Sequence, residues 1–332
     1  TRRQNHRKRP SNGAEMNDMK PSCIVLESDY TGEHNARMGV AEWLGGPIHK
    51  ISIEEARETS QRKTENAALL KADVLIGGTG EETTELVLDL ANGMNQPLTI
   101  FLASILPDHL DQRIHDYDLV VGPPHDELSG PHVLTILGVP HRLRPETIGK
   151  LAPTVPNEDK KIAFLMGGNT RYCAGFTPDY AQRLGIRVSQ LANNLGTKII
   201  VTNSRRTPEE SLATFRKEIA HSEEAFIDWR DPDPTTYFNL LAEADLIICT
   251  GDSLSMCCEA AISGKTLLVT TDTEAMESYH TKTIQRLINA GYALEFQGDI
   301  ETWPQPTKVL DPTALTGTRI LELLRKRKDC FQ

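Results

Sequence analysis

The sequence predicts an α/β protein with two parallel-sheet domains, and three observations support this fold class. Short apolar runs recur along the chain, and each is followed by a polar or glycine-bearing turn and then by a helical pattern. The runs are continuously apolar, as in strands covered on both faces. The same rhythm restarts after a stretch that lacks periodicity. We therefore expect two sheets, each enclosed by helices.

The first domain is predicted over residues 21–148. Its expected strands lie within five apolar runs, at residues 23–30, 73–80, 98–105, 118–126 and 133–140. A segment with two prolines follows, and we interpret residues 149–160 as a linker.

The second domain is predicted over residues 161–332, with a basic helix at its end. Its expected strands lie within residues 162–169, 198–206, 225–231, 245–253 and 266–273. One helix is predicted to begin at Thr177, with Pro178 in its first turn, and to end at Gly196. A second is predicted to begin at Thr207, with Glu210 completing a capping box.

The charge balance argues against a general affinity for nucleic acid. The chain has 332 residues, with 36 Lys+Arg against 46 Asp+Glu, which gives a formal net charge of −10. Positive charge is concentrated near the two ends, in residues 1–20 and in residues 325–328. We interpret residues 1–20 as a disordered tail. These basic ends suggest contact with an anionic membrane surface, although inert solvated segments would look the same.

The cysteines and the hydropathy indicate a cytoplasmic protein. The six cysteines form no CxxC pair and no spacing suited to zinc, so we expect reduced thiols and no metal site. No apolar run is long enough to span a bilayer. The expected localisation is cytoplasmic, with peripheral membrane contact as an option.

The polar residues of interest follow predicted strands. In open parallel sheets, ligands bind where the strands end and the helices begin. We expect the two carboxyl edges to face one another across a cleft, with the second domain carrying the richer set. Gly167, Gly168 and Asn169 follow one strand, and this pattern suits either a phosphate-binding turn or simply a tight turn.

Arg205 and Arg206 stand between a strand and a predicted helix start, where positive charge is unfavourable unless an anion is present. The site suits a phosphate, although both side chains could equally extend into solvent or pair with Glu209.

Further along, Asp252 or Ser253 is predicted to cap an apolar helix that contains one acid, Glu259. A carboxylate in such a helix is unfavourable unless it is exposed or hydrogen-bonded. A ribose diol supplies two donors, so Glu259 either binds a ribose or lies on a solvated stripe.

The first domain offers two further groups. Gly32, His34 and Asn35 are expected before a helix, on the acceptor side of the cleft. His125 and Asp126 follow another strand, and His125 suits a general base that removes a proton from an acceptor hydroxyl. A surface loop histidine is the alternative.

Several of these segments together resemble the ELM-type mitochondrial fission protein family, whose bacterial members are described as glycosyltransferases. The similarity runs from about residue 24 to 303. It is carried by these segments: DLVVGPPHDELSGPHVLTILGVPHRL, FLMGGNTRY, IIVTNSRRTP, YFNLLAEADLIICTGDSLSMCCEAAISGK and YHTKTIQRLINAGYALEF.

The resemblance implies a GT-B-like architecture of two facing Rossmann-like domains that bind a nucleotide sugar without a metal or cofactor. It implies phosphate contacts from Gly167, Gly168, Ser204, Arg205 and Arg206, and a ribose contact from Glu259. The sugar nucleotide would be surrounded by Asp252, Ser253, Ser255 and Met256, and His125 and Asp126 occupy the family's His-Asp position. The chain departs from the family pattern at Ala36 and at the turn before Tyr237.

The preferred functional hypothesis is therefore a glycosyltransferase that uses a nucleotide-diphosphate sugar and an acceptor of lipid or lipopolysaccharide type. Two alternatives stay open. Plant members of the family act as adaptors that recruit dynamin-related proteins, and the same architecture also supports sugar-nucleotide epimerases.

Overall fold

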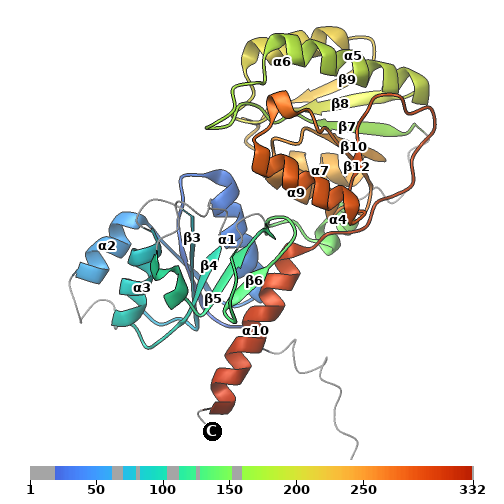
Figure 1. Ribbon diagram of the computed structural model, residues 1–332. Helices are drawn as coiled ribbons and strands as arrows, with labels where there is room; N and C mark the ends of the chain where they lie inside the picture. The colour runs from blue at the N-terminus through green and yellow to red at the C-terminus, as the bar shows by residue number, and fades with distance from the viewer. Residues whose placement is uncertain are drawn as a thin grey trace, which may run out of the picture. The chain divides into compact units, whose positions relative to one another are not determined.

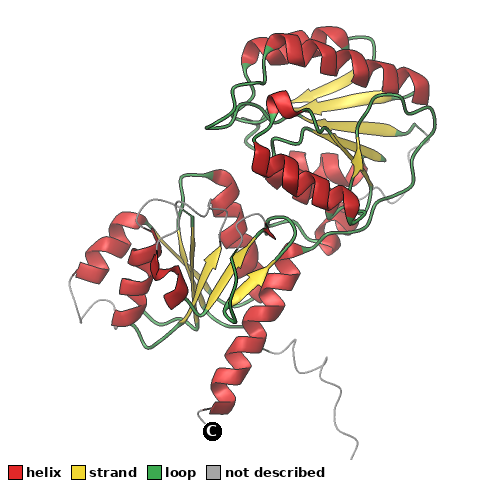
Figure 2. Cartoon of the chain, viewed as in Figure 1, coloured by secondary structure: helices red, strands yellow, loops and turns green. Residues whose placement is uncertain are grey.

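The computed structural model describes residues 19–61, 70–79, 83–102, 112–124, 128–151 and 159–330, which form two compact units (Figures 1 and 2). The first unit contains the described residues up to Val121, then Ser129–Leu134 and the residues from Thr313 onward. The second contains the described residues of Gly122–Leu128 and of Thr135–Pro312. Each unit has its own six-stranded sheet, so the predicted α/β class with two parallel-sheet domains is confirmed.

The first sheet has the strand order β2-β1-β3-β4-β5-β6. Neighbouring pairs from β2 to β5 are parallel. The strands are β1 (Cys23–Leu26), β2 (Ile48–Ile51), β3 (Val74–Gly78), β4 (Leu98–Leu102), β5 (Leu119–Gly122) and β6 (Val133–Thr135). The helical segments are α1 (Thr31–Leu44), α2 (Ile53–Gln61), α3 (Thr83–Gly93), η4 (Gln112–Asp116) and α10 (Pro312–Cys330).

The second sheet has the order β12-β11-β10-β7-β8-β9, and every pair in it is parallel. The strands are β7 (Lys161–Leu165), β8 (Lys198–Thr202), β9 (Glu223–Ile227), β10 (Leu246–Cys249), β11 (Thr266–Val269) and β12 (Leu294–Glu295). The helical segments are α4 (Pro145–Leu151), α5 (Pro178–Leu195), α6 (Glu209–Glu218), α7 (Pro234–Glu243), α8 (Leu254–Ala261), η6 (Thr273–Ala275) and α9 (Ser278–Asn289).

The continuous apolar character of β7 follows from burial on both faces of this sheet. Ile162 and Phe164 belong to a core with residues of α5 and α6, whereas Ala163 and Leu165 belong to a second core with residues of α7, α8 and α9. Figure 1 shows α5 and α6 on one face of the sheet and α7 and α9 on the other. Alternate residues of the strand therefore supply two separate cores.

Arg37 of α1 joins the carboxyl ends of β1 and β3. Its guanidinium donates to the carbonyl oxygens of Leu26 (2.7 Å), Glu27 (3.0 Å) and Thr79 (2.7 Å). The residue is 1% exposed and lies 3.5 Å from the carboxylate of Glu33. A buried cation thus provides hydrogen bonds to three carbonyl groups at the ends of these strands.

The helix α10 packs on the first unit, whereas the sequence interpretation placed residues up to 332 in the second domain. Gly317 lies against the ring of Trp43 in α1, so close that a Cβ atom there would overlap the ring. Arg327 donates to the carbonyl oxygen of Gln96 (3.1 Å) and to the carboxylate of Asp118. An amphipathic sequence does not reveal which sheet it will cover, since both units offer apolar faces.

Three further segment predictions can be compared with the structure. The segment predicted as a linker overlaps α4, whose Ile148 lies in the core of the second unit. Residues 1–18 of the predicted tail lie outside the described residues. None of the helices in the described part of the chain has the length and apolar character needed to cross a membrane.

The two predicted helix starts differ in outcome. Thr177 caps α5 by accepting from the Tyr180 N–H (3.2 Å), and Gly196 ends the helix with φ of 63°. The predicted capping box at Thr207 is wrong, because the N-cap residue of α6 is Pro208 and no side chain caps that helix. The Thr207 hydroxyl is engaged elsewhere, by the loop that follows β7.

Two helical glycines give a matched test of the α10 contact. Gly149→Ala has open space around the new methyl group and should stabilise the protein by about 0.5–1 kcal/mol through helix propensity. Gly317→Ala gains the same propensity but forces the rigid Trp43 ring aside, so it should be net destabilising, by about 1–3 kcal/mol. Urea denaturation measures both, and increased amide exchange in α10 should accompany only Gly317→Ala. Equal stabilisation by the two substitutions would contradict the packing described.

Arg37→Met should destabilise the first unit by about 3 kcal/mol, because it leaves buried carbonyl oxygens without a donor. Amide exchange in β1 and β3 should rise with it. Arg319→Met on α10 is the control, since its ion pair with Glu322 is on the surface and is expected to contribute less than about 1 kcal/mol. A loss at Arg37 no larger than the loss at Arg319 would refute this role.

Candidate functional site

The candidate site lies at the carboxyl edge of the second sheet, around β7 and β10. These strands are neighbours in the middle of the sheet, at the point where the strand order reverses direction. In doubly wound sheets, ligands bind at this switch point because the flanking loops diverge there. The loops after β7, β8 and β10 carry most of the residues that the sequence singled out.

Gly167 and Gly168 allow the loop after β7 to lie directly on its neighbours. A Cβ atom at Gly167 would overlap the Asp252 carboxylate, and one at Gly168 would overlap the Arg206 carbonyl. The Gly167 N–H donates to Thr250 Oγ1 (2.7 Å), and the Gly168 N–H donates to Asp252 Oδ2 (2.8 Å). Both N–H groups already have protein acceptors, which favours the tight-turn interpretation over a direct phosphate contact.

Arg206, which is partly exposed, and the buried Asp252 form an ion pair that joins three loops. Arg206 Nη2 lies 3.1 Å from Asp252 Oδ2, while Nη1 donates to the carbonyl oxygens of Gly168 (3.1 Å) and Asn169 (3.0 Å). Asp252 is 2% exposed, and its other carboxylate oxygen, Oδ1, is buried without a hydrogen-bond partner in the structure. Burial raises the pKa of Asp252, and the guanidinium charge opposes that rise. Asp252 therefore holds Arg206 and the loop after β7 in place.

The loop after β8 is fixed by its hydroxyl groups. Ser204 Oγ donates to the Gly167 carbonyl (3.1 Å), and Thr207 Oγ1 donates to the carbonyl of Met166 (3.2 Å) and contacts that of Gly167. The Asn169 N–H donates to the Arg206 carbonyl (3.1 Å). These contacts leave Arg205 as the exposed cation of this loop, next to the engaged Arg206.

The helix α8 begins directly after Asp252, with Ser253 as its N-cap. Ser253, one of the two residues predicted to cap this helix, occupies the N-cap position, but its side chain makes no capping hydrogen bond. The N–H groups of the first turn consequently receive no cap from Ser253. Ser255, Met256 and Glu259 lie on the partly exposed side of α8, while Cys257 and Cys258 are fully buried.

Glu259 is paired with a tyrosine. The Tyr237 hydroxyl donates to Glu259 Oε2 (3.0 Å), and Tyr237 stands in the first turn of α7. Burial raises the pKa of Glu259 to about 7, and the hydroxyl bond opposes the rise. Although part of the residue stays accessible, its carboxylate is in a poorly solvated place. Glu259 thus changes its charge near neutral pH.

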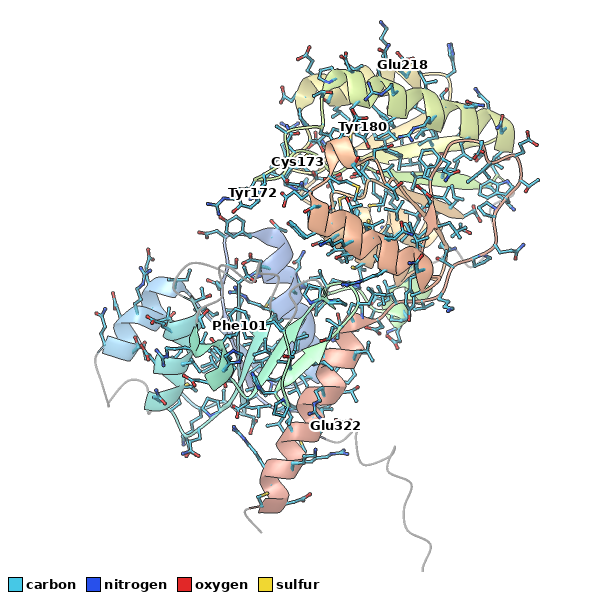
Figure 3. All side chains as sticks on the ribbon, in the orientation of Figure 1. Phe101, Tyr172, Cys173, Tyr180, Glu218 and Glu322 are labelled. Carbon is cyan, nitrogen blue, oxygen red and sulfur yellow. The ribbon has the colours of Figure 1, made fainter. Side chains whose placement is uncertain are left out.

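The sequence analysis missed a third carboxylate at this edge, Glu277, which precedes α9. It is 9% exposed and accepts from the Tyr172 N–H (3.4 Å) and from the Thr170 hydroxyl. Figure 3 labels Tyr172, a 64% exposed residue on the loop between β7 and α5. A single acid in a polar segment has no distinctive spacing, so no sequence pattern indicates Glu277.

In the first unit, the predicted acceptor-side residues Gly32, His34 and Asn35 lie inside α1. The helix begins at Thr31, so the expectation that they precede a helix is wrong. All three are partly exposed in its first two turns. His125 and Asp126 lie outside the described residues, and their predicted role stays a prediction.

The chain is similar to several known proteins. The model of the family described as Mitochondrial fission ELM1 matches residues 26–324. The Arabidopsis thaliana mitochondrial fission protein ELM1 is 22% identical over 336 residues, which cover 90% of this chain and 73% of that protein. An uncharacterized protein of Rickettsia prowazekii is 29% identical over 146 residues, 44% of this chain and 41% of that protein's length.

Among solved structures, the UDP-GlcNAc 2-epimerase of Methanocaldococcus jannaschii gives a TM-score of 0.57 with 12% identity, covering 92% of this chain and 99% of that one. The glycosyltransferase AviGT4, involved in avilamycin A biosynthesis, gives 0.50 with 11% identity, covering 92% and 96%. At this identity the likeness shows the fold alone, which is GT-B-like. Since the family model spans nearly the whole chain, the protein belongs to the mitochondrial fission ELM1 family.

Proposed function

We propose that the protein binds a nucleotide-diphosphate sugar at the carboxyl edge of its second sheet and transfers the sugar to an acceptor. The observation that carries this proposal is the convergence of three loops at the switch point, fixed by Arg206 and Asp252. The GT-B-like fold, found in glycosyltransferases and in UDP-GlcNAc 2-epimerases, supports it.

The diphosphate would lie between Arg205 and the start of α8. Arg205 is the exposed residue of the loop after β8, which the hydroxyl groups of Ser204 and Thr207 hold in place. Its charge is therefore accessible to an anion. The first turn of α8 presents N–H groups that Ser253 does not cap, and helix N-termini favour anions. Together they would neutralise the charge that develops on the leaving diphosphate, the role often taken by a metal ion.

The ribose would be bound by Glu259. This carboxylate has one donor from Tyr237 and spare acceptor capacity, and a vicinal diol provides two further donors. Ser255 and Met256, on the same side of α8, would contact the rest of the nucleotide. Asp252, which is buried, would act by positioning Arg206 and not by touching the ligand.

The acceptor hydroxyl would lose its proton to His125, with Asp126 beside it in the sequence, as the glycosidic bond forms. We propose a lipid-linked or lipopolysaccharide acceptor. The exposed Lys326 and Lys328 near the end of α10 would favour an anionic membrane surface, whereas Arg327 is engaged by Asp118.

Two alternatives rest on the comparisons. The curated relative is a mitochondrial fission protein, so a non-catalytic adaptor is one alternative. The UDP-GlcNAc 2-epimerase neighbour makes an epimerase the other. NMR of a sugar nucleotide incubated with the protein in water separates them: an epimerase yields a C2 epimer, a transferase slowly transfers the sugar to water and releases the nucleoside diphosphate and the free sugar, and an adaptor leaves the compound unchanged.

A thermal-shift panel of UDP, GDP, ADP and CDP tests for the nucleotide site. At least one of these nucleotides should raise Tm. Glu259→Gln should weaken the binding of that nucleotide by about 10- to 100-fold, the range expected for loss of a hydrogen bond to a charged group. Glu243→Gln, which changes an exposed carboxylate on α7, is the control and should bind like the wild type. If none of the four nucleotides raises Tm, the proposed function is refuted.

Arg205→Ala should leave Tm without ligand nearly unchanged, because the side chain is exposed, but should weaken binding of the diphosphate by roughly tenfold. Binding of the corresponding nucleoside should change far less. Calorimetric titration measures both, and Lys198→Ala, at the amino end of β8, is the control. Equal losses for nucleoside and diphosphate would remove Arg205 from the phosphate site.

A further inference from the structure

The contact between Tyr237 and Glu259 joins two helices that both begin at the carboxyl edge of the second sheet. Tyr237 is in the first turn of α7, and Glu259 is in the second turn of α8. The hydroxyl donates to Oε2 at 3.0 Å, which fixes one lone pair of the carboxylate. The aromatic ring packs on the core formed by α7, α8 and α9. This packing holds the hydroxyl in place.

Glu259 has no cationic partner among the described residues. The titratable groups that act on the pair are the Cys249 thiol from β10 and the Cys257 and Cys258 thiols from α8. Burial raises the pKa of the Cys258 thiol, and a hydrogen bond with the Cys249 thiol, together with burial, raises the pKa of Cys257, so both stay neutral thiols. This arrangement contrasts with Asp252, whose charge is balanced by Arg206.

A carboxylate in these surroundings favours a particular class of ligand. The remaining lone pairs of the carboxylate can accept hydrogen bonds, and Glu259 lies on the partly exposed side of α8, where a ligand can reach it. An anionic group would be repelled. A neutral pair of hydroxyls, spaced as in a ribose, can donate to one carboxylate without adding charge.

We infer that Tyr237 is a positioning residue that orients Glu259 to accept both ribose hydroxyls, so that the site selects ribonucleotides over 2′-deoxyribonucleotides and binds them through the ionised carboxylate. This inference rests on the proposed function. Where the Glu259 carboxyl group is protonated before binding, its proton leaves for the solvent as the diol hydroxyls begin to donate to the ionised oxygens.

The direction of the pH dependence follows from the ionised form being the one that binds. With a pKa of about 7, the ionised fraction of Glu259 falls from about nine tenths at pH 8 to about one tenth at pH 6. Since apparent affinity scales with the competent fraction, the ribose contact should weaken by about tenfold over this interval. The Tyr237 hydroxyl lowers the pKa of Glu259, so its removal should move the midpoint to higher pH.

The experiment is calorimetric titration of the full chain with UDP, GDP and ADP and with their 2′-deoxy counterparts, from pH 6 to pH 8.5. The ratio of the two affinities cancels the protonation of the diphosphate itself. We expect a ribose preference of about tenfold or more at pH 8 that falls toward pH 6.

Tyr237→Phe should move the midpoint of this preference upward, and Glu259→Gln should abolish its pH dependence. Tyr292→Phe, which removes another partly buried hydroxyl from the same unit, should leave the midpoint unchanged.

The outcomes separate the inference from the function. If the diphosphates bind but ribose and 2′-deoxyribose forms bind equally at every pH, the ribose selectivity is refuted while the nucleotide site stands. If the preference persists in Tyr237→Phe with an unchanged midpoint, Tyr237 has only a structural role. If no diphosphate binds, the proposed function fails and the inference fails with it.

Discussion

The loops at the carboxyl edge of the second sheet depend on one ion pair, between the partly exposed Arg206 and the buried Asp252. A carboxylate that is 2% exposed is strongly unfavourable in its charged form unless hydrogen bonds and an opposite charge compensate for its burial. Here the compensation comes from the loops themselves, through the Gly168 N–H and the Arg206 guanidinium. Protein groups alone consequently hold the loops after β7, β8 and β10 together. Such preorganisation is what a binding site at a strand edge requires.

The two acids of the α8 region are handled in different ways. Asp252 is paired with a cation and has little accessible surface, whereas Glu259 is paired with a neutral hydroxyl and stays partly exposed. The first arrangement suits support of the loops, and the second leaves a titratable acceptor open to a ligand. The sequence interpretation put both residues in contact with the nucleotide. Burial distinguishes them, because Asp252 lies against the loop after β7 and Arg206, whereas Glu259 contacts Tyr237 of α7. Sequence spacing reveals neither set of contacts.

Much of the fold could be predicted, because each central strand is buried on both faces and reads as an apolar run. The strands that the sequence did not predict, β2 and β12, lie at the sheet edges. His49 and Lys50 of β2 are exposed, as are both residues of β12, so neither has an apolar run to detect. The site was predictable as far as its location after strand ends. The partners were not, because Thr207, Tyr237 and Glu277 make contacts that join residues far apart in the chain.

The placement of α10 affects how the protein is made. The helix completes the first unit, through Gly317 against Trp43 and Arg327 with Asp118, yet it is encoded at the end of the described chain. During vectorial synthesis the ribosome releases the sheet of the first unit early and its last helix only after the second unit has been translated. The first unit therefore stays incomplete, with the side chains that α10 will cover still exposed, until the second unit has emerged from the ribosome.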